Sequence, residues 1–476
     1  MLAGELLKNC PSDISGIDVT GIAYDSRKVT DNNIFVCIKG YETDGHKYAA
    51  SAAANGAAVI VAQDRIDVDV PVIYVNDTRK ALAELASAFY KDPSSNLSLV
   101  GITGTNGKTT TTYLVKSILE AAGKRVGVIG TNQNIIGDKL LLTKSTTPTT
   151  PNALELQQLF NEMVNNSAEY VVMEVSSHAL ELDRVYGCTF DVGVFTNLTQ
   201  DHLDFHGTME NYFLAKAKLF DISKKGVINA DDKYCSRIGG SDIMTIGLSG
   251  ERDLKAENIK ITPRGSEFDL IYKGERKKAY IAIPGQFSVY NALCAAGAAL
   301  QLGIDIDTII EGLGNAHGVV GRVEVVPTDT DYTVIIDYAH TPDGLENVIQ
   351  CVKGFAEGRT ITLFGCGGDR DNTKRPIMGE ISGKLSDFTI ITSDNPRTED
   401  PELIVRDIEV GMKKTDGKYI LITDRREAIG YALDMAQKGD VIILAGKGQE
   451  TYQIIGKEKF DFDERIEVYT HLKRDC

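Results

Sequence analysis

The sequence lacks a long apolar run, a cysteine pair of the CxxC type and any low-complexity tract. No segment approaches about eighteen consecutive apolar residues, which argues against a membrane-spanning helix. A secretory signal has a basic stretch followed by an apolar stretch, and the start of the sequence, MLAGELLKNC, does not show this pattern. The eight cysteines are scattered, so reduced thiols are expected rather than disulfides or zinc ligands, and only Cys366 lies near candidate chemistry. We therefore expect a cytoplasmic protein that is not inserted in a membrane.

Positive charge is also in short supply. The formal net charge of −16 argues against a nucleic-acid partner, although it leaves room for a local basic pocket. A length of 476 residues, 42% of them hydrophobic, is enough for three domains that each bury a core. We place these domains at residues 1–96, 97–320 and 321–476.

A glycine-rich turn carries the strongest functional signal. Residues 97–113 read LSLVGITGTNGKTTTTY, an apolar strand, a turn holding Gly104, Gly107 and Lys108, and a run of hydroxyls that opens a helix. Backbone N–H groups, the helix N-terminus and the lysine can converge on nucleotide phosphates, and the hydroxyl of Thr109 can bind Mg²⁺. The full P-loop pattern has a further glycine where this chain has Ile102, so this is a variant whose extra glycine is Gly101. A glycine-rich turn of some other doubly wound domain is the alternative, but the order of strand, loop and helix favours a site for ATP or GTP.

The rest of the chain divides into segments of different pattern. Short strand-like runs precede a helical stretch, and KDPSSN then indicates a linker. Strands and helices alternate from residue 97 to about 320, which predicts a mostly parallel sheet, with a small antiparallel excursion between about 254 and 287. From residue 321 the runs YTVIIDYAH, RTITLFGCGG, DFTIITSDNPR, KYILITD and DVIILAGKG each lead from an apolar strand into a polar loop.

Several polar side chains follow these strands. Glu174 ends the strand YVVM, which suits a Mg²⁺ ligand, although a solvated loop glutamate is the alternative. His202 and His206 lie four apart, but Asp204 and Gly207 interrupt the helical pattern and no third strong ligand follows, so a single histidine near Mg²⁺ is favoured over zinc.

Two more segments leave the choice between structural and functional roles open. Lys216 and Lys218 interrupt an apolar helix, and Lys218 is interpreted as an ordinary surface lysine. Asp337 and His340 end a strand before Pro342 opens a helix, so they belong either to a ligand site or to a capping network.

Together these segments resemble the Mur ligases, the ATP-dependent enzymes that build the peptidoglycan stem peptide. The shared motifs run through essentially the whole chain: GTNGKTT, MEVSSH, TNLTQDHLD, YxxxKxxLF, GQFSVYNALCAA, GR and DYAHTPD. Other segments resemble the branch that adds the third residue: DSRKV, KGYETDGH, CGGDRDNTKRP, DNPRTEDP, DRREAI and GKGQE. The resemblance implies an α/β protein of three-domain Mur ligase architecture, with a small N-terminal α/β domain, a central P-loop ATPase domain with a mostly parallel sheet and a C-terminal Rossmann-like domain.

The resemblance also implies the reaction and its cofactors, ATP and Mg²⁺. The γ-phosphoryl group of ATP passes to the D-glutamate γ-carboxylate of UDP-N-acetylmuramoyl-L-alanyl-D-glutamate, and the amine of meso-2,6-diaminopimelate then displaces phosphate. Protein catalysis of this kind is mostly positioning and electrostatics. A monomer is expected, and a lysine-adding ligase of the same family is the alternative.

Residue roles are carried over position by position. Nucleotide contacts are implied for Gly104, Thr105, Asn106, Gly107, Lys108, Thr109, Thr110, Asn291, Arg322, Asp337 and His340. Catalysis is assigned to Lys108, Glu174, His202 and Lys216, and metal binding to Thr109, Glu174, His202 and Lys216. Lys216 matches a carbamylated lysine, a modification that turns a cation into a carboxylate-like anion suited to magnesium. The family's usual asparagine three residues before Asn291 is here Ser288, whose role stays open.

Substrate contacts come from all three domains. The UDP-sugar peptide is assigned to Tyr24, Ser26, Tyr41, Glu42, Thr43, Thr146, Thr147, Ser176 and Arg184. The incoming amino acid is assigned to Arg370, Asp394, Asn395, Pro396, Arg397, Gly446 and Glu450, with Arg375 as a weaker candidate. Diaminopimelate has a distal carboxylate that lysine lacks, and a guanidinium can bind it through two hydrogen bonds. Lysine-adding relatives usually lack the DNPR arginine, so Arg397 favours diaminopimelate.

Three rival interpretations remain. A folylpolyglutamate synthase or the D-alanyl-D-alanine-adding Mur enzyme would not explain the DNPR and GKGQE loops. A P-loop kinase or motor ATPase should carry an aspartate after a second strand and leaves the third domain's loops unexplained. A non-catalytic nucleotide-gated module would not need Lys108, Glu174, His202 and Lys216 together.

Overall fold

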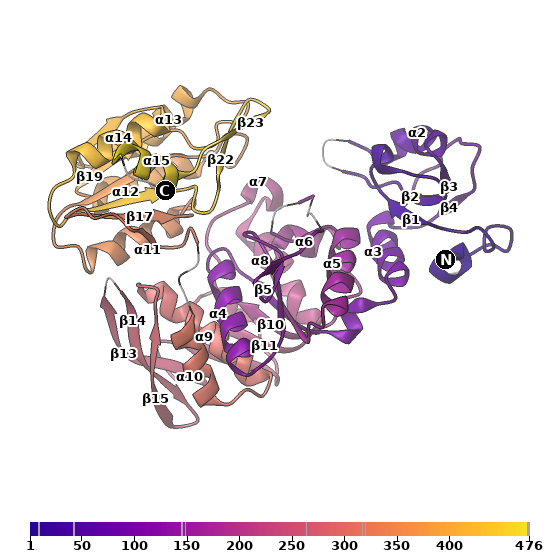
Figure 1. Cartoon of the computed structure of the whole chain (residues 1–476), viewed down its shortest axis with the longest axis horizontal. Helices are drawn as coiled ribbons and strands as arrows, with labels where there is room; N and C mark the ends of the chain where they lie inside the picture. The colour runs from indigo at the N-terminus through magenta and orange to yellow at the C-terminus, as the bar shows by residue number, and fades with distance from the viewer. Residues whose placement is uncertain are drawn as a thin grey trace. The chain divides into compact units, whose positions relative to one another are not determined.

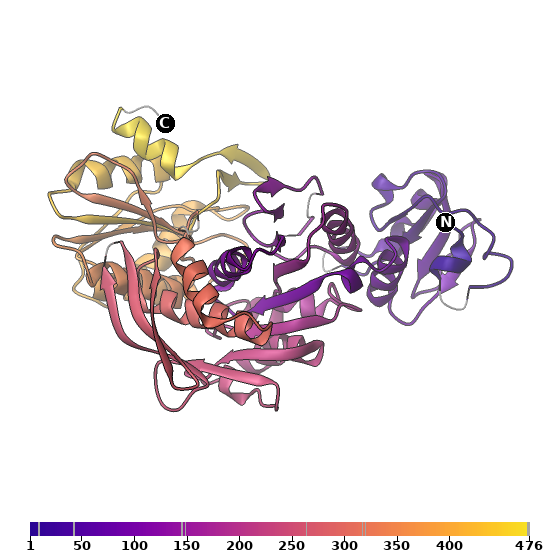
Figure 2. The ribbon, with the colours of Figure 1, turned by 60° about the horizontal axis from the view of Figure 1, so that its bottom comes forward.

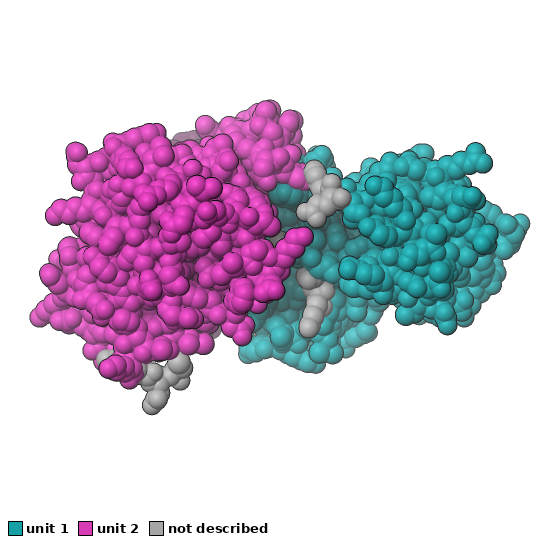
Figure 3. Space-filling model, turned by 90° about the horizontal axis from the view of Figure 1, so that it is seen from above, with its two compact units in different colours: residues 1–103, 123–193, 215–226 teal, residues 104–122, 194–214, 227–476 magenta. Residues whose placement is uncertain are grey.

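The computed structural model describes residues 1–7, 10–40, 43–143, 146–147, 149–262, 264–316, 318 and 320–473. The chain forms two compact units that alternate along the sequence, coloured separately in Figure 3. Unit 1 is Met1–Thr103, Gly123–Gly193 and Ala215–Gly226, and unit 2 is Gly104–Ala122, Val194–Leu214 and Val227–Cys476. No described helix has both the length and the apolar character needed to cross a membrane.

Unit 1 begins with a four-stranded parallel sheet in the order β1-β2-β3-β4 (Figure 1). Its strands are β1 (Gly21–Ala23), β2 (Asn33–Val36), β3 (Ala57–Ala62) and β4 (Val72–Tyr74). The strand-like runs predict the last three, whereas β1 was not predicted. Helix α3 (Thr78–Phe89) packs Leu82 and Leu85 into the core under this sheet. The Asp77 carboxylate starts α3 by accepting the backbone N–H groups of Arg79 and Lys80 at 2.8 and 3.2 Å.

The second part of unit 1 is a sheet in which β5, β9, β6, β7 and β8 are neighbours in that order. Strands β5 (Ser98–Thr103), β9 (Tyr170–Glu174) and β6 (Val126–Ile129) are parallel, and β7 (Ile135–Ile136) and β8 (Lys139–Leu140) are antiparallel. Gly101 of β5 makes room for other side chains, because a Cβ there would lie 2.8 Å from the Phe190 ring and 3.0 Å from Leu219. It is a packing glycine rather than an extra phosphate contact.

The helices of unit 1 include three that carry candidate site residues. They are α5 (Ala153–Asn165), α6 (Ser177–Glu181) and most of α8 (Met209–Asp221). The predicted linker KDPSSN contains a short 3₁₀ helix, η3 (Pro93–Asn96), because Pro93 fits its first turn and is buried with Ser94. The segment joins α3 to β5, and its interpretation as a linker between domains stays a prediction.

In unit 2, the glycine-rich loop opens α4 (Lys108–Ala121), which packs against α9 (Gln286–Gln301) and α10 (Ile306–Asn315). The predicted antiparallel excursion is confirmed as β13 (Leu254–Thr262), β14 (Gly265–Tyr272) and β15 (Glu275–Ile281), with β12 (Ile243–Gly247) parallel to β13 (Figure 2). Strands β10 (Phe190–Phe195) and β11 (Ser223–Asn229) each have residues in both units.

The second part of unit 2 is a six-stranded sheet in the order β16-β17-β21-β18-β19-β20 (Figure 1). All its strands are parallel except the edge strand β16. They are β16 (Glu324–Val326), β17 (Thr333–Asp337), β18 (Thr360–Phe364), β19 (Phe388–Ile391), β20 (Tyr419–Leu421) and β21 (Val441–Ala445). The carboxyl ends of parallel strands meet at one edge, so the loops after β17, β18, β19 and β21 are gathered there.

Helices cover both faces of this sheet. Ile335 and Ile443 face one core together with α11, α12 and α13, while Ile336 and Ile442 face the other together with α14 and α15. The alternation follows from the two-residue period of a strand, and apolar residues at both phases explain the continuous apolar runs. The helices are α11 (Pro342–Lys353), α12 (Lys374–Leu385), α13 (Pro401–Met412), α14 (Arg425–Met435) and α15 (Glu464–His471).

Candidate functional site

The glycine-rich loop of unit 2 depends on two glycines with positive φ. Gly104 has φ 145° and Gly107 has φ 83°. A Cβ at Gly104 would collide with the Thr196 hydroxyl, and one at Gly107 would collide with the Asn291 side-chain oxygen. No other residue fits at either position, so the backbone stays open to a close-lying ligand.

Polar side chains of the segment after β10 hold this loop. The Asn106 backbone N–H donates to Asn197 Oδ1 at 2.9 Å, and the Thr196 hydroxyl donates to the Asn106 carbonyl at 2.6 Å. The Thr105 hydroxyl bonds the Thr199 carbonyl at 3.1 Å. The TNLTQDHLD motif therefore serves first as a brace that fixes the loop.

Lys108 and Thr109 lie at the start of α4. Lys108 Nζ donates to the carbonyls of Gly104 and Thr105, each at 2.9 Å, so its ammonium lies over the loop that it follows. Thr109 is buried, and Arg322 Nη2 donates to its hydroxyl at 3.3 Å. The Arg322 guanidinium also stacks 4.6 Å from the Tyr338 ring centre. Two cationic groups thus lie where phosphate oxygens are expected.

The loop also contacts the first turn of α11. Asn106 Nδ2 donates to Asp343 Oδ2 at 2.7 Å, and the Thr341 hydroxyl lies 3.5 Å from Asn106 Oδ1. Burial raises the pKa of Asp343, although the bond from Asn106 opposes the shift. Asn106 therefore joins the glycine-rich loop to the six-stranded part of unit 2, in addition to the hydrogen bond from Arg322 to Thr109.

Asp337 and His340 follow β17, as predicted, and both have structural partners. The Asp337 carboxylate accepts the N–H groups of Val323 and Ala339 at 2.7 and 2.8 Å, while burial raises its pKa. Burial lowers the pKa of His340 to about 4, so the ring is neutral at pH 7 and donates from Nδ1 to the Tyr338 carbonyl at 2.9 Å. Both alternatives weighed for this loop are thus compatible with its geometry.

The two histidines of the TNLTQDHLDFHG segment differ. His202 has φ 53° and precedes α7 (Leu203–His206), and its Nε2 lies 3.4 Å from buried Asp201. Burial acts to raise the pKa of Asp201, but His202 and Lys374 outweigh it and lower that pKa. His206 is buried, with its ring centre 4.9 Å from that of Tyr212. The helical pattern is interrupted at Gly207, as predicted, because α7 ends there with φ 74°, although Asp204 lies within its single turn. His202 precedes α7, and both histidine rings lie near the Tyr212 ring, at 6.3 and 4.9 Å between ring centres.

In unit 1, Glu174 ends β9 with its side chain 1% exposed. Its carboxylate accepts the Thr131 backbone N–H at 2.9 Å and the Thr131 hydroxyl at 3.0 Å. Gly130 lies so close that a Cβ there would collide with Oε1 of this carboxylate. Lys216 of α8 is also 1% exposed, whereas Lys218 is at the surface in an ion pair with Glu181, as predicted.

The residues assigned to the UDP-sugar peptide include a hydrogen-bonded group around Tyr24. The Tyr24 hydroxyl bonds Thr146 at 2.8 Å and donates to Glu155 at 2.5 Å, and Asn152 Nδ2 donates to it at 3.2 Å. Burial raises the pKa of Tyr24 to about 12. Glu155 and Asn152 were missed in the sequence, because only their position near Tyr24 in the fold distinguishes them from ordinary residues at a helix start.

Other assigned residues have local partners. The Ser176 hydroxyl caps α6, and the Thr147 hydroxyl donates to the Thr150 carbonyl at 2.8 Å. The Ser26 carbonyl accepts from Asn55, and the Thr43 hydroxyl lies 3.3 Å from Tyr48. Tyr41 and Glu42 lie outside the described residues.

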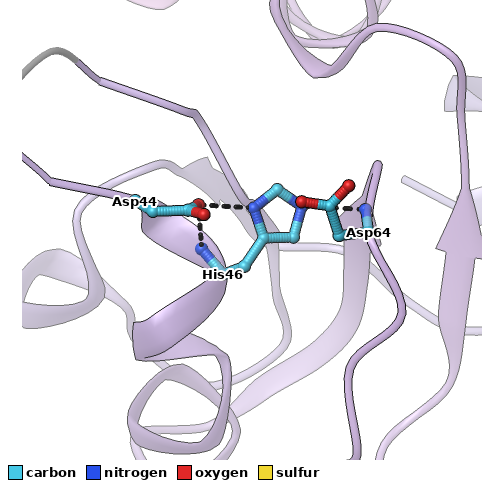
Figure 4. A group of neighbouring side chains, drawn as sticks. All are labelled: Asp44, His46 and Asp64. Atoms are coloured by element: carbon cyan, nitrogen blue, oxygen red, sulfur yellow. Dashed lines mark hydrogen bonds and ion pairs between the residues drawn. The ribbon is translucent and has the colours of Figure 1, made fainter.

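The KGYETDGH motif contributes two side chains to a group that has the composition of a metal site, and the third comes from the segment after β3. Asp44, His46 and Asp64 offer ligand atoms within 4.8 Å of one another (Figure 4). However, His46 Nε2 accepts the backbone N–H groups of Gln63 and Asp64 at 3.0 and 3.2 Å, and Nδ1 lies 2.6 Å from Asp44. The lone pair of Nε2 is therefore in use, and the histidine ties this loop to the end of β3 rather than binding a cation.

The DNPR and GKGQE loops meet at the carboxyl edge of the six-stranded sheet. Asn395 Nδ2 donates to Glu450 Oε2 at 2.9 Å. Lys447 is 0% exposed and bonds Asn395 Oδ1 at 3.1 Å and the Tyr452 carbonyl at 2.8 Å, with Asp394 at 3.2 Å. Gly446 has φ 114° beside Asp394. Lys447 was missed, although it is present in the GKGQE motif, because a lysine in a loop is usually exposed.

The arginines near this edge have different environments. Arg397 has φ 51° and donates from Nη1 to the Gly368 carbonyl at 2.7 Å, which leaves further N–H donors on its guanidinium. Arg370 is exposed and donates to the Asp369 carbonyl at 2.9 Å, and the Pro396 carbonyl packs against Gly368. Two side chains thus remain as candidates for carboxylate binding.

Arg375 and Cys366 are buried and have partners within the fold. Arg375 is 2% exposed and pairs with Glu399 and Asp407, each at 2.9 Å, so it has less capacity for a substrate carboxylate than Arg397 or Arg370. Cys366 is buried against Met378, and burial raises the pKa of its thiol to about 12, which removes it from nucleophilic chemistry at neutral pH.

A second arginine, missed in the sequence, braces the same edge. Arg425 is fully buried and donates twice to Glu464 of α15, at 2.9 and 2.7 Å. It also donates to the carbonyls of Ser393 and Ala445, at 3.3 and 2.8 Å. These carbonyls lie at the ends of β19 and β21, so the pair fixes the two strand ends from which the DNPR and GKGQE loops begin.

Comparisons with known proteins agree with this architecture. Three family models match in succession: "Mur ligase family, catalytic domain" at residues 18–90, "Mur ligase middle domain" at 102–299 and "Mur ligase, glutamate ligase domain" at 321–448. A protein of Clostridium acetobutylicum named UDP-N-acetylmuramoyl-L-alanyl-D-glutamate--2,6-diaminopimelate ligase 1 is 52% identical, with 96% of this chain and 95% of its own covered. A protein of Caldanaerobacter subterraneus named UDP-N-acetylmuramoyl-L-alanyl-D-glutamate--2,6-diaminopimelate ligase is 50% identical, with 97% of each chain covered.

Solved structures show the same relationship. One described as a UDP-N-acetylmuramoyl-L-alanyl-D-glutamate--2,6-diaminopimelate ligase has a TM-score of 0.70 and 32% identity, with 99% of both chains covered. MurF ligase from Thermotoga maritima in complex with ADP shares the fold, with a TM-score of 0.64, 21% identity, and 89% of this chain and 93% of its own covered. With relatives about half identical over almost its whole length, and with the α/β architecture expected, the chain belongs to the Mur ligase family.

Proposed function

We propose that this chain is an ATP-dependent ligase that adds meso-2,6-diaminopimelate to the D-glutamate γ-carboxylate of UDP-N-acetylmuramoyl-L-alanyl-D-glutamate. The observation that carries this proposal is the joining, within unit 2, of a phosphate-type loop to an arginine-bearing sheet edge through Asn106 and Asp343. The names of relatives about 50% identical support the same reaction. The protein is proposed to act as a cytoplasmic monomer without a nucleic-acid partner.

The reaction needs an activated carboxylate, because a free carboxylate has no good leaving group for an amine to displace. The γ-phosphoryl group of ATP forms a bond to a γ-carboxylate oxygen and ADP leaves, and the diaminopimelate amine then attacks the acyl phosphate and expels phosphate. Gly104 to Thr110 hold the phosphates, with Lys108 exchanging its two carbonyl partners for β/γ oxygens. Arg322, Asp337, His340 and Asn291 complete the nucleotide site.

Magnesium is proposed as the cofactor that neutralises the phosphate charge when bound. The donor chemistry of the assigned residues fits it: Thr109 offers a hydroxyl, Glu174 a buried carboxylate and His202 an imidazole. A buried ammonium at Lys216 would not bind a cation, whereas the carbamylated form would present oxygens.

Gly130→Ala tests the role of Glu174 without removing the carboxylate. The new methyl group would collide with Oε1 and displace it from Thr131, so the Mg²⁺ concentration for half-maximal activity should rise at least roughly 10-fold. Phosphate release measured across a magnesium titration gives this value. Gly314→Ala, which meets open space, is the matched control, and equal magnesium requirements in both variants would contradict the assignment.

The amino-acid substrate is proposed to bind at the carboxyl edge of the six-stranded sheet, where Asp394, Asn395, Pro396, Gly446 and Glu450 line the loops. The free donors of Arg397, with exposed Arg370, would bind the distal carboxylate of diaminopimelate. The remaining substrate contacts are Tyr24, Ser26, Tyr41, Glu42, Thr43, Thr146, Thr147, Ser176 and Arg184.

The deciding experiment measures ATP-dependent phosphate release with UDP-N-acetylmuramoyl-L-alanyl-D-glutamate and either meso-diaminopimelate or L-lysine. We expect turnover with diaminopimelate, and a loss of roughly 10- to 100-fold in kcat/KM for it in Arg397→Ala, with any lysine turnover unchanged. Turnover with lysine alone would keep the ligase but overturn the role of Arg397. Phosphate release that needs neither amino acid nor UDP-sugar peptide would overturn the proposed function.

A further inference from the structure

A pocket in unit 1 is lined by more cationic than anionic side chains. It has a volume of about 240 Å³ and lies between residues that follow β1 and β2, residues of α3, and residues around α5 and α6. Its polar lining includes Tyr24, Arg79, Thr147, Asn152, Asp183 and Arg184. Two guanidinium groups and one carboxylate therefore face the same small space.

Neither arginine is neutralised within the described part of the chain. No ion pair involves Arg79 or Arg184 there, although the charge of Glu155 acts on Arg184 and favours its charged form, and Arg184 Nε is buried without a hydrogen-bond partner. Burial lowers the pKa of Arg184, and the charge of Arg79 lowers it further, as expected of two neighbouring cations. Burial raises the pKa of Asp183, against the attraction of Lys80. A buried, unpaired polar group of this kind calls for a partner.

Backbone carbonyls hold both side chains in place. Arg79 lies in the first turn of α3 and donates from Nη2 to the Lys39 carbonyl at 2.5 Å. Arg184 donates from Nη1 to the Thr150 carbonyl at 3.0 Å. Each bond uses only part of a guanidinium fork, so further N–H donors of both arginines remain for a ligand.

We infer that Arg79 joins Arg184 in an oxyanion subsite for the UDP-sugar peptide, so that the substrate is held from α3 as well as from the residues assigned by resemblance. This inference rests on the proposed function and adds a residue to it. The ligand group is a phosphate of the diphosphate or a carboxylate of the muramoyl peptide, since both accept hydrogen bonds from paired guanidinium groups.

Calorimetric binding of UDP and of UDP-N-acetylmuramoyl-L-alanyl-D-glutamate to wild type, Arg79→Gln and Arg79→Lys tests the subsite. Arg79→Gln should raise the Kd of the full substrate at least 10-fold, and Arg79→Lys should recover part of the loss. An equal loss for UDP identifies a phosphate, while a loss confined to the full substrate identifies a carboxylate. Lys91→Gln removes an exposed cation just beyond α3 that does not line the pocket, and this variant should bind both ligands as wild type does.

Two results would count against these ideas in different ways. Unchanged Kd values in Arg79→Gln, with wild type active, would overturn the subsite and leave the proposed function intact. Failure of the wild type itself to bind the UDP-sugar peptide would overturn the proposed function. Thermal unfolding of each variant within about 2 °C of wild type shows that any loss is local, because ordinary surface substitutions change stability little.

Discussion

Lys108→Ala is expected to reduce kcat/KM roughly 100- to 1,000-fold, which is the usual effect of removing one group that stabilises charge in a transition state. Lys108 Nζ lies over the glycine-rich loop, where it donates to the carbonyls of Gly104 and Thr105. Phosphate oxygens would replace these carbonyls as acceptors. Without the ammonium, the loop keeps its N–H groups but loses the cation that stabilises the negative charge on the phosphate oxygens during phosphoryl transfer. The measurement is initial-rate phosphate release with both substrates saturating and ATP varied.

Lys116→Ala is the matched control for this prediction. Lys116 lies two turns further along α4 and pairs with Glu120 at 2.7 Å, one turn away on the same helix. An ion pair of this kind contributes less than about 1 kcal/mol, so activity should stay close to wild type. If Lys108→Ala retains the activity of Lys116→Ala, the loop does not act on phosphates in the proposed way.

Glu464→Gln is expected to lower the free energy of unfolding of the six-stranded part of unit 2 by about 3–5 kcal/mol, since it leaves the buried Arg425 charge without its counter-ion. Both side chains of this pair are 0% exposed. Arg425 also bonds the carbonyls at the ends of β19 and β21, so its displacement would disturb the DNPR and GKGQE loops as well. Affinity for diaminopimelate should therefore fall together with stability.

Glu467→Gln provides an internal comparison on the same helix. Glu467 pairs with Arg426, the residue after Arg425, but that arginine is 65% exposed. Its loss should change the free energy of unfolding by less than about 1 kcal/mol. Urea unfolding followed by circular dichroism suits this test, because the chain has no tryptophan. Equal destabilisation by the two substitutions would show that burial of the Arg425–Glu464 pair does not increase the free energy lost when its carboxylate is removed.

The strands and the glycine-rich loop could be predicted because their signals are local. Continuous apolar runs such as VIILA are typical of strands covered on both faces, and β21 has this environment. The positions of Gly104 and Gly107 follow from backbone geometry that other residues cannot adopt without collision. Such features depend on neighbours in sequence, so the sequence alone indicates them.

The groups that were missed depend on contacts between distant segments. Glu155 lies 131 residues from Tyr24, and Lys447 lies 52 residues from Asn395, so no local pattern relates them. Arg375 resembled a ligand because arginines in glycine-rich loops often are, but Glu399 and Asp407 from other segments neutralise it. The fold decides which charged side chains are already paired and which remain for a substrate.

In the six-stranded part of unit 2, the residues that stabilise the fold and the residues proposed to bind the amino acid occupy different places. Its faces are filled by apolar side chains under α11–α13 and α14–α15, whereas DNPR and GKGQE lie in loops beyond the strand ends. Substitutions at Arg370 or Arg397 leave these cores untouched, so a family built on this sheet can exchange one amino-acid specificity for another without refolding its scaffold. Lys447 and Arg425 cannot be exchanged in the same way. Each is buried and donates to a backbone carbonyl of the segments that carry the loops, so a substitution there would disturb the scaffold itself.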